Sequence, residues 1–244
     1  MTDTPLYLQL GFTLITIASI GGIFWASKSE LVLTVFVLIG IYSAALASMG
    51  FFHQPDAMPP RLPLVILPAL LFMIWLFFSG KGRGVLNKMD MKRMTYVHTV
   101  RVPVELCIFA LFTYGLMPES MFFEGRNWDV FSGLTAPLIA YFGYQSRVLP
   151  KWILIGWNIL CLALVLRVVS TGILAAPSVI QQFDFDQPNV AVLLFPYVWL
   201  PAIVVPVVFI RHLSAMRSLY KSSNRYKWAA IAEPISLLHQ SCSQ

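Results

Sequence analysis

Seven apolar segments, the fifth of them shorter than the others, constrain this chain more than any other feature. A bilayer core of about 30 Å is crossed by about 20 helical residues. Only 11% of the 244 residues are charged, and 58% are hydrophobic. We therefore predict an all-α, polytopic integral membrane protein with seven transmembrane helices, and exclude a soluble enzyme, a disordered chain and a disulfide scaffold. The segments are Leu6–Ala26, Leu31–Phe51, Leu62–Phe78, Thr95–Leu116, Val130–Tyr144, Lys151–Leu174 and Val190–Ile210.

Basic residues gather on alternate loops. The loops after the first, third and fifth segments and the tail carry thirteen Lys and Arg, whereas Arg61 and Arg126 are the two on the other side. Because basic loops stay in the cytoplasm, we predict the N-terminus outside and the C-terminus inside. The short loops favour a bacterial inner membrane. We therefore attribute the net charge of +6 to these cytoplasmic loops beside the lipid bilayer, and we predict that the chain does not bind nucleic acid.

The chain resembles itself. Phe52–Ala69 and Phe185–Ala202 share eight identities in eighteen positions, three of them prolines, and a weaker match relates the first and fifth segments. We predict a duplication in which both three-helix units enter the membrane in the same direction, a plan known among transporters. The predicted parts are repeats at 1–80 and 118–212, a basic cytoplasmic loop at 81–94, a connector helix at 95–117 and a basic tail at 213–244.

Prolines recur in the third and seventh segments. Each removes a backbone donor and bends its helix, and the freed carbonyl needs a partner away from lipid. We predict that these helices face the centre of the bundle, with hinges at Pro63, Pro68, Pro196 and Pro201. The alternative is that the kinks only shape packing.

The 3+1+3 plan with an outside N-terminus resembles the SWEET sugar transporters in topology alone. Those proteins place a Pro-Gln pair in their repeats, whereas this chain has Gln54-Pro55 and Gln187-Pro188 in a different loop. No functional residue is carried over. The segment Val190–Ile210 contains no lysine, which excludes a retinal Schiff base there.

The fourth segment carries three ionisable residues on one helical stripe: His98, Arg101 and Glu105. Glu105 falls near mid-membrane, where a charge must be paired or hydrated, and Arg101 is the expected partner. Two hypotheses follow. The pair is either a proton-responsive coupling site or a structural lock for this helix. His98 is expected near the inner surface.

Further polar residues fall in the sixth segment and the outer loops. Asn158 and Arg167 lie on different faces of the sixth helix, and Arg167 is expected either to pair with an outer-loop carboxylate or to reach the lipid headgroups. The outer loops could bind a small polar solute or a hard cation, or simply be hydrated connectors. The loop candidates are Glu124, Arg126, Asp129, Asp184, Asp186 and Gln187.

The first functional hypothesis is a small-solute transporter or permease, coupled to protons through Glu105 and Arg101. The alternative is a non-transporting sensor or complex subunit that binds a ligand or protein partner through its acidic outer loops. An intramembrane lipid-modifying enzyme is the third. We predict no cofactor and no metal site, since phosphate-binding glycine loops and His-Glu-x-x-His motifs are absent. A second copy of the chain is a further candidate partner.

Overall fold

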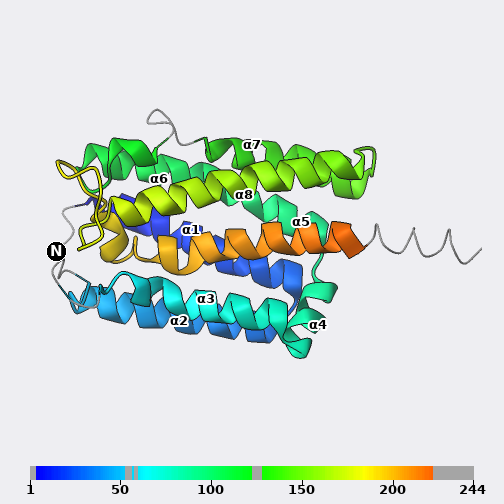
Figure 1. Cartoon of the computed structure of the whole chain (residues 1–244), viewed down its shortest axis with the longest axis horizontal. Helices are drawn as coiled ribbons and strands as arrows, with labels where there is room; N and C mark the ends of the chain where they lie inside the picture. The colour runs from blue at the N-terminus through cyan, green and yellow to red at the C-terminus, as the bar shows by residue number, and fades with distance from the viewer. Residues whose placement is uncertain (1–3, 53–56, 58–59, 123–127, 222–244) are drawn as a thin grey trace, which may run out of the picture.

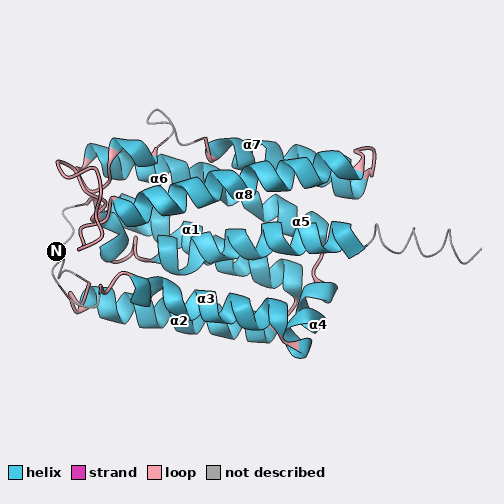
Figure 2. Ribbon diagram, viewed as in Figure 1, coloured by secondary structure: helices cyan, strands magenta, loops and turns pink. Residues whose placement is uncertain are grey.

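The computed structural model describes residues 4–52, 57, 60–122 and 128–221, and every regular element in these ranges is helical (Figure 2). The elements are α1 (Leu6–Ser27), α2 (Glu30–Ser48), α3 (Pro63–Phe78), α4 (Gly80–Lys88), α5 (Met91–Tyr96), η1 (Val97–Val100), α6 (Arg101–Thr113), η2 (Glu119–Met121), α7 (Val130–Leu138), η4 (Ile139–Gln145), α8 (Lys151–Leu174), η5 (Ala191–Leu193) and η6 (Leu200–Val204). The helix that begins at η6 continues to Lys221 and is called the last helix here.

Five helices in the described ranges are long and apolar enough to cross a membrane. They are Leu6–Ser27, Glu30–Ser48, Met91–Thr113, Lys151–Leu174 and Leu200–Lys221. The pair α3 and α4 adds a sixth span if the 86° bend between them is counted within one crossing. The prediction of an all-α protein with several apolar spanning helices is therefore confirmed, and the seventh crossing stays a prediction.

The helices run along the long axis of the molecule in three groups (Figure 1). α2 and α3 lie on one side, and α6, α7 and α8 lie on the other. α1 and the last helix lie between them, where α1 contacts α2 and α6, and η6 contacts α1, α2 and α3. Within the most apolar 18-residue window of each helix, 67% of the last helix is buried, against 28% of α8. The last helix is thus a core element, whereas α8 turns much of its apolar surface outward, as a lipid-facing helix does.

α4 turns sharply back against α3. Ser79 caps it by accepting a hydrogen bond from the Gly82 amide at 2.9 Å. Gly82 allows the bend because a Cβ there would lie 2.6 Å from the Leu76 carbonyl oxygen. The basic segment predicted at 81–94 is therefore largely helical. It lies at the same end as the turn between η4 and α8 and the end of the last helix, where Lys221 Nζ donates to Asn87 Oδ1 at 2.8 Å (Figure 1).

The four hinge prolines have different structural positions. Pro63 is the first residue of α3, where a missing amide hydrogen removes no helical hydrogen bond. The kink that we predicted at Pro63 is therefore absent. Pro68 lies inside α3. Pro201 lies in the wide helical turn η6, and Pro196 lies in the turn before it. α3 and η6 are in contact, which brings these two proline-containing segments together in the bundle.

Candidate functional site

An ion pair between α6 and α7 anchors the polar centre of the bundle. Arg101 Nη2 lies 2.5 Å from Asp129 Oδ1, and the two side chains are 3% and 12% exposed. Arg101 is the first residue of α6, and Asp129 directly precedes α7. The sequence pointed to Glu105 as the partner of Arg101, but the structure places the outer-loop candidate Asp129 against it instead.

A glycine explains why Asp129 reaches Arg101. Gly133 lies four residues after Asp129, on the same face of α7. A Cβ at Gly133 would lie 2.9 Å from Val102 Cγ2 and 3.2 Å from Arg101 Cβ. The two helices therefore approach more closely than a larger residue allows, and the short aspartate side chain spans the remaining distance.

Glu105 lies one helical turn beyond Arg101 and is buried, with 3% of its surface exposed. It also interacts electrostatically with Arg101. All three residues contribute to the wall of one cavity. The stripe predicted in the fourth apolar segment is thus buried in η1 and α6, and Arg101 forms its ion pair with Asp129 at the start of α7.

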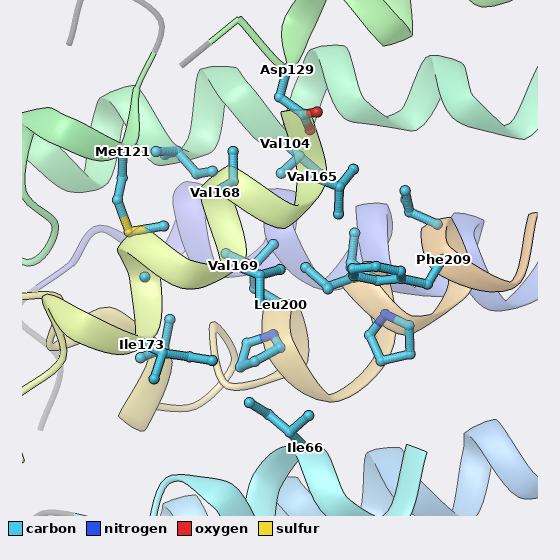
Figure 3. Close-up of a pocket in the computed structure, with 18 of the residues that line it drawn as sticks. Ile66, Val104, Met121, Asp129, Val165, Val168, Val169, Ile173, Leu200 and Phe209 are labelled. Carbon is cyan, nitrogen blue, oxygen red and sulfur yellow. The ribbon is translucent and has the colours of Figure 1, made fainter. Parts of the chain in front are cut away.

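The cavity has a volume of about 260 Å³ and lies between α3, α6, α8 and the last helix. Leu70 of α3 belongs to its lining and is itself 44% exposed, so this side chain lies between the cavity and the outer surface. In Figure 3 the aliphatic side chains from α8 and the last helix lie around this space, with the Asp129 carboxylate at its edge. Apart from Arg101, Glu105, Asp129 and Asn189, most of the lining is aliphatic: Ile66, Leu70, Met73, Val104, Ile108, Val165, Val168, Val169, Ile173, Leu200, Val204 and Val205.

Two histidines meet in the core near this ion pair. His98 of η1 and His212 of the last helix are 2% and 0% exposed, and their ring centroids are 4.2 Å apart. Trp157 lies 5.6 Å from each ring. Asn158 Nδ2 donates to the Leu154 carbonyl at 2.8 Å, so its Oδ1, 3.0 Å from His212 Nδ1, accepts the hydrogen bond from the ring. Neutral His212 therefore carries its proton on Nδ1.

Arg211 is the most deeply buried cation of the last helix, with 1% of its surface exposed. None of its three guanidinium nitrogens has a hydrogen-bond partner within the described residues. It interacts electrostatically with Arg101 and His98, both of them basic groups. An arginine in this position differs sharply from Arg101, whose charge is matched by Asp129.

The structure brings most of the predicted membrane residues together but leaves one out. His98, Arg101, Glu105 and Asn158 all point into the bundle and are buried. Arg167 is on the exposed side of α8. It therefore does not belong to this cluster.

Arg211 and His212 were missed because the seventh apolar segment was expected to end at Ile210. The helix instead continues to Lys221. The available signal was helical spacing, since His212, Ala215 and Leu219 are all buried and recur every three or four residues.

Several outer-loop candidates stabilise the loops themselves. Asp184 accepts a hydrogen bond from Ser120 at 2.6 Å. Gln187 donates to the carbonyls of Phe112 at 2.9 Å and Met117 at 2.6 Å, and so ties its loop to the end of α6. Asp186 is exposed, and Glu124 and Arg126 lie outside the described residues. Within those described, no group of three or more His, Cys, Asp or Glu side chains is placed to hold a metal ion.

No protein-family model matches this chain, and no curated protein or solved structure is detectably similar to it. The function must therefore be argued from the cavity and the charged groups around it.

Proposed function

We propose that the protein is a multi-pass membrane transporter of a small, largely apolar molecule, and that the cavity between α3, α6, α8 and the last helix is its substrate site. The observation that carries this proposal is the composition of the cavity: an aliphatic lining with Arg101, Glu105 and Asp129 in one wall. Ligand sites commonly combine an apolar lining with a few polar groups that orient the ligand.

The buried charges give the site a means of responding to protons. Buried charges in a membrane are costly and commonly mark substrate or proton pathways. Asp129 is the ion-pair partner of Arg101, and Glu105 is a second buried carboxyl group in the cavity wall, so its protonation would change the charge of that wall. Proton coupling through Glu105 is therefore part of the proposal.

The proposed orientation has the N-terminus outside a bacterial inner membrane. It is supported by the basic residues of α4, which lie at the same end of the bundle as Lys221. The proposed seventh crossing consists of α7 and η4, which follow each other without a break over residues 130–145. The proposed 3+1+3 repeat is supported by the contact between α3 and η6, its two proline-containing segments.

The test is a transport assay with a cavity-filling variant. Purified protein is reconstituted in liposomes and screened with a panel of small alcohols, amines, carboxylic acids and sugars. Val168 lines the cavity, so we expect Val168→Trp to fill it and to abolish the flux expected of the wild type. Leu166→Trp is the matched control, because Leu166 of α8 is 52% exposed and does not line the cavity. Equal flux through wild type and Val168→Trp, or no flux of any solute, would contradict the proposal.

The same assay tests the coupling. Glu105→Gln keeps the size and hydrogen-bonding capacity of the side chain but removes its titration. We expect the pH dependence of uptake to disappear in this variant while its helical content, measured by circular dichroism, is unchanged. An unaltered pH profile would exclude Glu105 as the coupling group.

A second candidate function is an intramembrane enzyme that acts on a lipid-soluble substrate. The observation that favours it is the presence of two carboxylates, Glu105 and Asp129, in the wall of one apolar cavity. Paired carboxyl groups can act as acid and base on one substrate. Mass spectrometry of the solute recovered after transport separates the two, since a transporter returns it chemically unchanged.

A further inference from the structure

The charge of Arg211 has no counterpart within the described residues. Its side chain is 1% exposed, and its Nε, Nη1 and Nη2 atoms make no hydrogen bond there. Asp129 is the ion-pair partner of Arg101 instead. Removing an arginine from water without a counter-charge is strongly unfavourable, so a group that supplies negative charge at this position would stabilise the protein.

The neighbours of Arg211 favour an anion over a cation or a neutral group. Within the described residues, Arg211 interacts electrostatically with Arg101, His98 and His212, all of them basic side chains. His98 Nδ1 and His212 Nε2 also have no hydrogen-bond partner in the described ranges. The region thus offers a guanidinium with all of its donors free and two imidazole rings beside it.

This basic region adjoins the apolar cavity. Arg101, with which Arg211 interacts electrostatically, lines the cavity. Val208 and Phe209 of the last helix also line it and precede Arg211 by three and two residues. Arg211 itself does not line the cavity, but long side chains on a helix lean toward its N-terminus, so we expect its guanidinium to lie near the turn of Val208.

We propose that the ligand of the cavity is an amphipathic organic anion, whose apolar part occupies the cavity and whose anionic head is bound by Arg211. The carboxylate is the simplest such head, because guanidinium and carboxylate form paired, charge-assisted hydrogen bonds. This inference rests on the proposal that the cavity is the substrate site, and it adds the chemical class of the substrate.

The inference is tested by binding to purified protein in lipid nanodiscs, with the rise in unfolding temperature as the measurement. The probes are hexanoate, hexanol and hexylammonium, which share one apolar chain and differ in charge, and acetate, which has the head without the chain. We expect hexanoate to stabilise the wild type at a concentration about tenfold lower than hexanol, since it alone adds a charge-assisted bond to the same apolar contacts. Hexylammonium and acetate should be weaker than hexanoate.

Two variants separate the head from the chain. Arg211→Leu should lose the preference for hexanoate over hexanol but still bind hexanol, whereas Val168→Trp should lose both. Arg217→Leu, which removes the same charge from the half-buried Arg217 of the same helix, should retain the wild-type preference.

The inference is overturned if hexanoate binds the wild type no better than hexanol, or if Arg211→Leu keeps the preference. Should Arg211→Leu fail to fold, the wild-type series still tests the preference for the anion, and its absence overturns the inference. The two proposals fail differently. Binding that depends on Arg211 without any flux in liposomes would contradict the transporter proposal alone. Flux of neutral solutes that is lost in Val168→Trp, without a preference for hexanoate, would contradict this inference alone.

Discussion

Two buried arginines in the same bundle are placed in opposite ways. Arg101, where α6 meets α7, has its charge matched by Asp129 at 2.5 Å. Arg211, in the last helix beside His98 and His212, makes no hydrogen bond within the described residues. Both are at most 3% exposed. The first arginine joins two helices, and the second is the residue to which we assign the anionic head of the ligand.

The largest expected effect comes from breaking the matched pair. Asp129→Leu leaves the Arg101 guanidinium buried without its counter-charge, and we expect the free energy of unfolding in mixed micelles to fall by about 3 to 5 kcal/mol. Adding Arg101→Leu to the same variant removes the stranded charge and should restore most of the loss. A loss below about 1 kcal/mol in the single variant would show that the pair does not join α6 to α7.

Removing the unmatched arginine should have the opposite sign. Arg211→Leu replaces a buried charge with an apolar group, and in the absence of added ligand we expect the free energy of unfolding to rise by about 1 to 4 kcal/mol. The same mixed-micelle unfolding measurement applies. If Arg211→Leu were as destabilising as Asp129→Leu, Arg211 would have a counter-charge within the protein, and the comparison between the two arginines would collapse.

The smallest effect concerns the helix contact that makes the pair possible. Gly133→Ala places a Cβ 2.9 Å from Val102 Cγ2, so α6 and α7 must separate, and we expect a loss of about 1 to 3 kcal/mol. Gly156→Ala in α8 is the control, because a Cβ there has no neighbour within 4 Å. It should leave stability unchanged or raise it by about 0.5 to 1 kcal/mol, as alanine favours the helix. Equal effects of the two substitutions would mean that close approach at Gly133 is unimportant.

Parts of the candidate site could be predicted because they lie within one helix. His98, Arg101 and Glu105 recur at helical spacing, and their burial follows from one polar stripe on an apolar helix. The partner of Arg101 could not be predicted in this way. Asp129 was assigned to an outer loop, and only the close packing at Gly133 brings it to Arg101.

The histidine pair was missed for a different reason. Hydropathy identifies the apolar part of a helix, but a helix can continue through polar residues that lower its mean hydropathy. The last helix does so past Arg211 and His212, because these side chains are covered by other helices and not by lipid.

By itself, the sequence determined that the chain is helical and carries several apolar segments long enough to cross a membrane, because both properties depend on runs of neighbouring residues. It also determined which loops are basic. Only the tertiary structure decided which buried polar side chains meet, since Arg101 with Asp129 and His98 with His212 are contacts between helices. The same packing left Arg211 without a hydrogen-bond partner among the described residues, and this is the main observation in favour of an anionic ligand.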